Sequence, residues 1–385
     1  MKMTCFLIAV AALAIPACAN DPDDPACELQ HFDLDHQASD QSGAEALGEA
    51  VRPRHGVYMA TLALGTPAQE VNAIIDTGSA NLVVMGPGCE GCDAVDYQPE
   101  SSTTAAEPGA AFTVMYGSAA LSATTTTDMV GLPCGDSVEA SFGVATQVAH
   151  LPSSILGLAY QSLAEPSGAP LTPWLDAMVD GGLLADIFSL RLCGAGRSGS
   201  HLKLGGMDAT IDASALAYTP IIEERYYGIA PPSFSLGEAA LGDGAATSII
   251  DSGTTLMLVP QAVHQALVTA LKAAAEAQGV SAQIPDGVWT ESASDISARA
   301  TLSEAEVGAL PPLTLTLQGE GSSDAFQLEV PPERYFRRAS TGDVYLGVRP
   351  GPGMTILGQV FMEGLDVVFD RAQKRVGFAA SGCGD

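Results

Sequence analysis

The chain has 385 residues, which is more than a single compact core needs and enough for two domains. Hydrophobic residues make up 47% of it, and its 41 glycines and 24 prolines favour a loop-rich β protein over a helical bundle. The 16 basic and 45 acidic residues give a formal net charge of −29, which argues against a nucleic-acid partner because phosphates would be repelled.

The first residues have the features of an export signal. Lys2 supplies a positive charge, and residues 6–15 form an apolar stretch too short to span a bilayer. Two processing schemes remain open: residues 17–19 form an A-x-A site that predicts a signal peptide of residues 1–19, whereas residues 15–18 are similar to a lipobox, with Cys18 as the lipidated residue. No later stretch is apolar and long enough for a transmembrane helix. We therefore expect an exported protein that is secreted, periplasmic or held at the cell envelope by a lipid anchor.

Cysteine usage agrees with export. Once Cys5 leaves with the signal and Cys18 is removed or lipidated, six cysteines remain, and an even number in an exported chain predicts three disulfides. They are Cys27, Cys89, Cys92, Cys134, Cys193 and Cys383. The Cys89-Glu-Gly-Cys92 segment is compatible with a metal or redox motif, but a small disulfide-closed loop is favoured because no second CxxC or nearby histidine cluster completes a zinc site. We expect no metal and no cofactor. The chain has no Asn-x-Ser/Thr sequon, which favours a bacterial source.

Along the chain, residues 20–55 are polar and acidic without a clear period, and they predict a flexible leader or linker. Strands are predicted at residues 57–64 and 71–75, separated by a turn at 65–67, and further strands at 112–116, 141–147 and 187–192. Two helices are predicted. One has Thr172 as its N-cap and Pro173 at its first position, and the other begins at Pro260 and ends at Gly279.

One pattern occurs twice. Residues 73–79 read Ala-Ile-Ile-Asp-Thr-Gly-Ser, residues 248–254 read Ser-Ile-Ile-Asp-Ser-Gly-Thr, and each copy is followed later by Ile-Leu-Gly, at 155–157 and 356–358. The repeated order predicts two lobes related by an approximate twofold axis, residues 56–219 and residues 220–385.

The repeat also predicts chemistry. An aspartate at the end of a buried strand is costly unless its charge is stabilised, and the glycine that follows permits a tight loop. Hydroxyl groups that can donate hydrogen bonds to the carboxylates come from Thr77, Ser79, Ser252 and Thr254, and the glycines are Gly78 and Gly253. If the loops face each other, Asp76 and Asp251 would share one proton, because two charges so close cannot both ionise. One carboxylate would then activate a water molecule as general base, while the protonated partner polarises a peptide carbonyl.

These motifs resemble those of the pepsin-like aspartic proteases from about residue 56 to the C-terminus. The resemblance implies a mostly β, bilobal fold with two pseudo-twofold-related β lobes, a central cleft and a few short helices. It implies a monomeric aspartic endopeptidase that acts on a polypeptide, with Asp76 and Asp251 as catalytic residues. Residues 114–118 lie where the family has its flap, so Tyr116 matches the flap tyrosine, followed by Gly117 and Ser118.

Within the family, residues 188–196, 362–371 and 374–383 are most similar to the β-secretase branch. This likeness implies a Cys193–Cys383 disulfide and leaves Cys89–Cys92 and Cys27–Cys134 as the other pairs.

The chain also departs from the family pattern. Many pepsins carry a tryptophan at the position of Val83, so closure of the flap is expected to differ, and the acidic leader does not match a basic pro-segment. The alternative is a catalytically silent, pepsin-fold binding or inhibitor protein of the cell envelope. Two intact aspartate motifs favour the enzyme.

Overall fold

The computed structural model describes residues 31–33, 35–37 and 57–384, except residues 117, 118, 134, 195, 196, 294, 295, 322–324 and 352. Several expectations lie outside the described residues: the export signal, lipidation of Cys18, the Cys27–Cys134 pair, and the flap residues Gly117 and Ser118.

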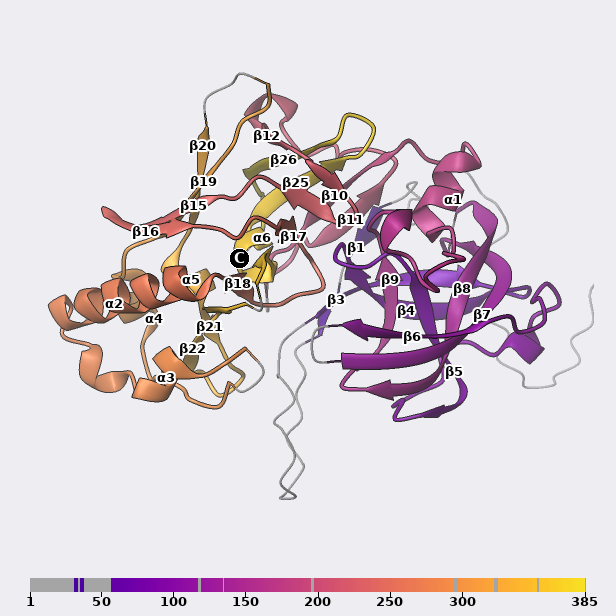
Figure 1. The fold of residues 1–385 in the computed structure, drawn as a ribbon, viewed down its shortest axis with the longest axis horizontal. Helices are drawn as coiled ribbons and strands as arrows, with labels where there is room; N and C mark the ends of the chain where they lie inside the picture. The colour runs from indigo at the N-terminus through magenta and orange to yellow at the C-terminus, as the bar shows by residue number, and fades with distance from the viewer. Residues whose placement is uncertain are drawn as a thin grey trace, which may run out of the picture.

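An eight-stranded sheet forms the N-terminal lobe, at the indigo end of the molecule in Figure 1. Its order is β2-β3-β4-β9-β5-β8-β7-β6, with β3 also pairing with β7. The strands are β2 (Asp35–Gln37), β3 (Val57–Leu64), β4 (Gln69–Asp76), β5 (Leu82–Glu90), β6 (Ala111–Tyr116), β7 (Ala119–Gly131), β8 (Ser137–Ala149) and β9 (Ser154–Gly157). Helix α1 (Trp174–Asp180) packs against β8, and the Trp174 indole donates to the Val130 carbonyl at 3.2 Å.

The C-terminal lobe contains most of the helices and three smaller sheets. A six-stranded sheet comprises β13 (Glu223–Glu224), β14 (Tyr227–Ile229), β17 (Ser248–Ile250), β24 (Thr355–Leu357), β18 (Met257–Val259) and β23 (Val348–Pro350). A four-stranded sheet comprises β16 (Ala239–Asp243), β15 (Ser233–Leu236), β19 (Leu313–Leu317) and β20 (Phe326–Val330), and β21 (Phe336–Arg338) pairs with β22 (Val344–Leu346). The helices are α2 (Gln261–Ala277), α3 (Asp286–Thr290), α4 (Glu304–Gly308), α5 (Pro332–Tyr335) and α6 (Gln359–Met362).

A third large sheet joins the two lobes. Its order is β1 (His31–Asp33), β11 (His201–Leu204), β10 (Ile187–Arg191), β25 (Leu365–Asp370), β26 (Arg375–Ala380) and β12 (Ala217–Pro220). Strand β10 pairs with β25 over its whole length, from Ile187 opposite Asp370 to Arg191 opposite Asp366. The end of the chain therefore returns to pair with a strand of the N-terminal half, as the central position of β10, β25 and β26 in Figure 1 shows.

The two lobes repeat one strand arrangement. In the first, β4 runs parallel to β9, β9 pairs antiparallel with β5, and β5 runs parallel to β8. In the second, β17 runs parallel to β24, β24 pairs antiparallel with β18, and β18 runs parallel to β23. The predicted mostly β, bilobal architecture is confirmed, and each copy of the repeated motif occupies the same place in its lobe.

Two local predictions were wrong. Within residues 20–55, predicted to be a flexible leader or linker, β1 pairs with β11 and β2 pairs with β3, because these neighbours present free edges to which a short segment can add backbone hydrogen bonds. Helix α1 begins one residue later than predicted, because the Pro173 carbonyl accepts the first helical hydrogen bond, from Ala177, and Pro173 rather than Thr172 is the N-cap. Helix α2 likewise begins one residue after its predicted start, with Pro260 as N-cap, and it ends before Gly279, whose φ is +73°.

Aromatic side chains fill the junction between the lobes. The Tyr227 ring lies 5.3 Å from that of Tyr160 and 4.6 Å from that of Phe369, and Phe369 stacks on Phe188 at 4.6 Å. Arg371 lies over Tyr160 and forms ion pairs with two carboxylates of the N-terminal half. This packing gives the two lobes a shared core.

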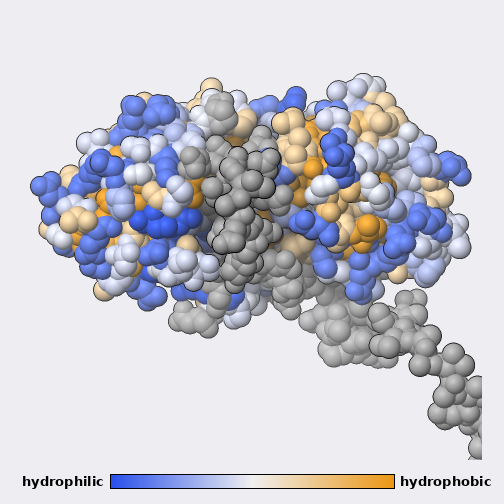
Figure 2. All heavy atoms as spheres, turned by 90° about the horizontal axis from the view of Figure 1, so that it is seen from below, coloured by the Kyte–Doolittle hydropathy of each residue, from blue (hydrophilic) through white to orange (hydrophobic). Residues whose placement is uncertain are grey.

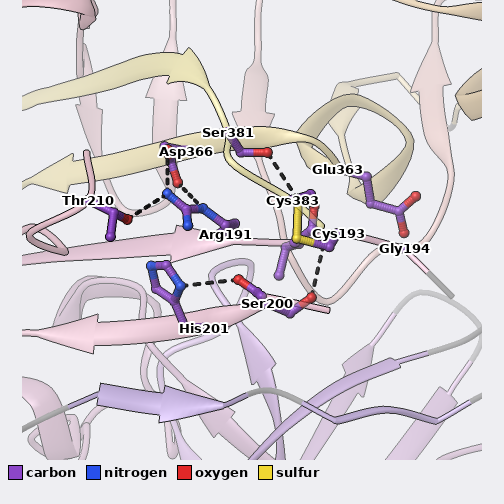
Figure 3. Close-up of a disulfide and its surroundings, with 12 residues drawn as sticks. Arg191, Cys193, Gly194, Ser200, His201, Thr210, Glu363, Asp366, Ser381 and Cys383 are labelled. Atoms are coloured by element: carbon purple, nitrogen blue, oxygen red, sulfur yellow. Dashed lines mark hydrogen bonds and ion pairs between the residues drawn. A yellow bond between two sulfur atoms is a disulfide. The ribbon is translucent and has the colours of Figure 1, made fainter. Parts of the chain in front are cut away.

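A disulfide and the buried ion pair of Arg191 with Asp366, at 2.6 Å, add further links between the halves (Figure 3). Cys193 is bonded to Cys383, and the adjacent Gly194 amide donates to the Tyr58 hydroxyl at 2.7 Å. Tyr58 in turn donates to Glu363 at 3.0 Å, and Glu363 pairs with Arg337 at 2.8 Å.

The surface seen in Figure 2 is largely hydrophilic over both lobes, and apolar residues on this face form separate patches. Large hydrophobic side chains that are substantially exposed include Met115, at 65%, and Ile222, at 60%. In the described part of the chain, no helix combines the length and the apolar character that crossing a membrane requires.

Candidate active site

Asp76 and Asp251 stand at equivalent places in the two lobes. Asp76 is the last residue of β4, opposite Gly157 of the parallel strand β9. Asp251 directly follows β17, and its amide donates to the Leu357 carbonyl of the parallel strand β24. The three residues before each aspartate are buried, which explains why Asp76 remains only 8% exposed and Asp251 only 7% exposed.

Each carboxylate is held by the loop that follows it. Asp76 accepts hydrogen bonds from the Gly78 amide at 2.8 Å and the Ser79 hydroxyl at 2.5 Å. Asp251 accepts hydrogen bonds from the Gly253 amide at 2.9 Å and the Thr254 hydroxyl at 2.6 Å. These donors offset part of the cost of burying a carboxyl group, and they fix its orientation.

The other two hydroxyl groups do not contact the carboxylates, contrary to our expectation. The Thr77 hydroxyl donates to the Ile250 carbonyl at 3.0 Å and accepts from the Ser252 amide at 2.9 Å. The Ser252 hydroxyl donates to the Ile75 carbonyl at 2.8 Å and accepts from the Thr77 amide at 3.1 Å. The residue after each aspartate points toward the opposite loop, so the four bonds fasten the two loops to each other.

The two loops approach closely enough that only glycine fits beside the carboxylates. A Cβ atom added to Gly78 would lie 2.6 Å from both oxygens of Asp251, and one added to Gly253 would collide with Asp76. Each glycine of one loop therefore faces the aspartate of the other, and the carboxyl groups lie in one shared space.

The electrostatics of this space favour a bound proton. Burial and the neighbouring charge of Asp251 raise the pKa of Asp76 well above its ordinary value, although the hydrogen bonds from Ser79 and Gly78 oppose the shift. A carboxylate can take a proton from a water molecule, and a carboxylic acid beside it can donate a proton to the bond that the water attacks. Together the two groups can therefore catalyse hydrolysis by general acid–base chemistry.

The predicted flap is a β-hairpin. Strand β6 ends at Tyr116, which pairs with Ala119 of β7 across the turn. Val83, which departs from the tryptophan of many pepsins, is 1% exposed and belongs to an apolar cluster with Phe112 of β6 and Leu121 of β7. The base of the hairpin is therefore anchored by aliphatic and aromatic packing, which the motif comparison did not predict.

Reasoning from sequence also missed Gln359, the residue after the second Ile-Leu-Gly. Its side chain is fully buried, and its amide nitrogen donates to the Ser252 carbonyl at 3.0 Å. Its backbone amide donates to the Thr254 carbonyl at 2.8 Å. Its place directly after a repeated motif was the only signal for it in the sequence.

Two of the expected disulfides join described residues: Cys193–Cys383 between distant segments, and Cys89–Cys92 within one short loop. The sulfur atoms of Cys89 and Cys92 pack beside the apolar cluster that anchors the flap hairpin.

Comparisons with known proteins agree with this geometry. The sequence model of the family described as eukaryotic aspartyl protease matches residues 57–381. The chain is 30% identical over 369 residues to a β-secretase from Strongylocentrotus purpuratus, covering 86% of this chain and 67% of that protein. It is 28% identical over 338 residues to pepsin A from Sus scrofa, covering 84% of this chain and 80% of that protein.

Proposed function

Because this chain belongs to the eukaryotic aspartyl protease family, we propose that it is an aspartic endopeptidase in which Asp76 and Asp251 act as one acid–base pair. The observation that carries the proposal is the pair of buried carboxyl groups, each held by its own loop and each facing the glycine of the other. The substrate class is a polypeptide that lies across the two lobes.

The proposed reaction begins with the shared proton on Asp76, where burial and the charge of Asp251 raise the pKa. Asp251 accepts a proton from a water molecule as the water oxygen attacks the peptide carbonyl carbon, and Asp76 donates its proton to the carbonyl oxygen. The tetrahedral diol then collapses. Asp251 gives its proton to the departing nitrogen, the C–N bond breaks, and Asp76 recovers its proton from a diol hydroxyl as the new carboxyl group forms.

The flap hairpin has a proposed role in holding the substrate. Tyr116, Gly117 and Ser118 are the proposed substrate contacts at the end of the β6–β7 hairpin, where a peptide lying over the aspartates would be enclosed. Closure would depend on the cluster around Val83 instead of a tryptophan hydrogen bond.

Export and a monomeric state complete the proposal. The two disulfides support an oxidising compartment, and the lobes already supply both halves of the site within one chain.

The test is cleavage of an unfolded protein between pH 3 and pH 7, with and without pepstatin. Wild-type protein should release peptides, and pepstatin, Asp76→Asn and Asp251→Asn should each abolish the release. Asp243→Asn is the matched control, because it removes an exposed carboxylate outside the site. If the wild type and Asp76→Asn are equally inert at every pH, the proposed function is wrong.

A further inference from the structure

Gln359 contacts the catalytic loop of the C-terminal lobe in a way that connects it to Asp251. The side chain is fully buried, Nε2 lies 3.0 Å from the Ser252 carbonyl oxygen, and Oε1 has no hydrogen-bond partner in the described structure. The opposite orientation of the amide would place two acceptors against each other. Gln359 therefore serves as a donor to Ser252.

The acceptor carbonyl belongs to the peptide unit whose N–H binds Asp251. Ser252 supplies the carbonyl of this unit and Gly253 supplies its N–H, which donates to Asp251 Oδ1 at 2.9 Å. A hydrogen bond to a peptide carbonyl polarises the amide and strengthens the bond that its N–H donates. Gln359 is thus one peptide unit away from a catalytic carboxylate.

This contact breaks the twofold relation between the lobes. The residue that follows Ile-Leu-Gly in the N-terminal lobe is Leu158, which is also fully buried but has no donor in its side chain. The corresponding amide, that of Gly78, binds Asp76 at 2.8 Å without such a side-chain donor from position 158. Asp251 also accepts a longer hydrogen bond from the Thr254 amide, at 3.3 Å. The two carboxyl groups therefore have unequal support for a negative charge, and Gln359 is the side chain that adds to this difference.

From this asymmetry we propose that Gln359 is a positioning residue that directs the shared proton to Asp76 and leaves Asp251 as the general base. The inference rests on the proposed function, because the two roles have meaning only for an acid–base pair. When the pair of aspartates holds one proton, the hydrogen bond from Gln359 keeps that proton on Asp76 before any substrate binds.

The direct test follows the two carboxyl groups by 13C NMR in full-length protein labelled at the aspartate carboxyl carbon. Asp76→Asn and Asp251→Asn assign the two signals. In wild-type protein, the pair should lose its first proton as the pH rises while the Asp76 signal keeps the position of a protonated carboxyl group. In Gln359→Leu, which copies the side chain of Leu158, this loss should move up by about half a pH unit and should also shift the Asp76 signal, because the remaining proton is then shared.

The matched control is Val360→Ala, which removes a fully buried group from the same helix without removing a donor. It should lower stability and leave the NMR midpoints unchanged. If Gln359→Leu also leaves the midpoints unchanged while it lowers stability as Val360→Ala does, Gln359 is merely structural and the inference is overturned.

A kinetic measurement separates this inference from the proposed function. In Gln359→Leu, the acid limb of the pH profile of kcat/KM should move up by about half a pH unit, with KM within about twofold of wild type. An unmoved acid limb would count against the inference. If the wild type cleaves nothing at any pH, the proposed function fails, and the NMR titration still decides whether Gln359 places the proton.

Discussion

Replacing Asp76 with Asn should stabilise the protein at neutral pH and have little effect in acid. A carboxyl group with a raised pKa binds its proton more tightly in the folded state, so stability falls as the pH rises from the ordinary carboxyl pKa toward the raised one. The pKa of Asp76 is raised to about 8. About three pH units separate pH 7 from an ordinary carboxyl pKa, and at ~1.4 kcal/mol per unit the upper limit is ~4 kcal/mol. Because Asp251 shares the proton, we expect a gain of ~2–4 kcal/mol for Asp76→Asn at pH 7.

The assay is the midpoint of thermal unfolding of wild type and Asp76→Asn between pH 3 and pH 7.5. The two midpoints should agree near pH 3 and diverge by several degrees as the pH rises, with the variant higher.

The matched control is Asp128→Asn, which should show the opposite slope. Burial raises the pKa of Asp128, but hydrogen bonds from Thr104 and Tyr97 outweigh burial and leave the pKa lowered. The stability that Asp128 contributes is therefore present at neutral pH and lost in acid, and its loss in the variant should be largest at pH 7. Parallel midpoints for wild type and Asp76→Asn at all pH values would refute a raised pKa at Asp76.

Five further substitutions, in three groups, test the connections between the loops and between the segments around them. Thr77→Val and Ser252→Ala should each destabilise the protein by ~2–4 kcal/mol in chemical unfolding, because each leaves a buried amide and a buried carbonyl without partners; a large difference between the two would contradict the twofold arrangement. Glu363→Gln should lower the free energy of unfolding by about 3 kcal/mol, because it leaves the buried charge of Arg337 without its partner. An unchanged stability in the same assay would show that this ion pair does not stabilise the fold. Cys193→Ser should lower stability by ~3–5 kcal/mol and Cys89→Ser by no more than ~2 kcal/mol, because the first disulfide closes a far longer loop. Equal losses would show that loop length does not determine how much each disulfide stabilises the protein.

The sequence was sufficient to predict the elements that the repeat duplicates. The apolar segments before Asp76 and Asp251, together with the Ile-Leu-Gly segments, predicted both the bilobal fold and the pairing of the two loops. They could do so because each half of the sequence contains the same motifs in the same order. Helix α2 was predictable for the same reason, with Pro260 and Gly279 marking its ends.

The parts that were missed depend on contacts between distant segments. The Thr77 and Ser252 hydroxyl groups point toward backbone carbonyls of the opposite lobe. The local sequence around each residue contains no information about these distant partners. Gln359 became significant only when the fold placed it beneath Ser252. The pairing of β1 with β11 depends on a free strand edge supplied by residues far along the chain.

The central claim is that the two aspartates act as a single unit, and its most direct test is kcat/KM for Asp76→Asn, Asp251→Asn and the double variant. If the pair acts as one unit, each single substitution should lower kcat/KM by at least ~10³-fold, and the double variant should be no slower than the worse single variant. A single variant that keeps a tenth or more of wild-type kcat/KM, or a double variant whose loss is the product of the two single losses, would contradict the claim.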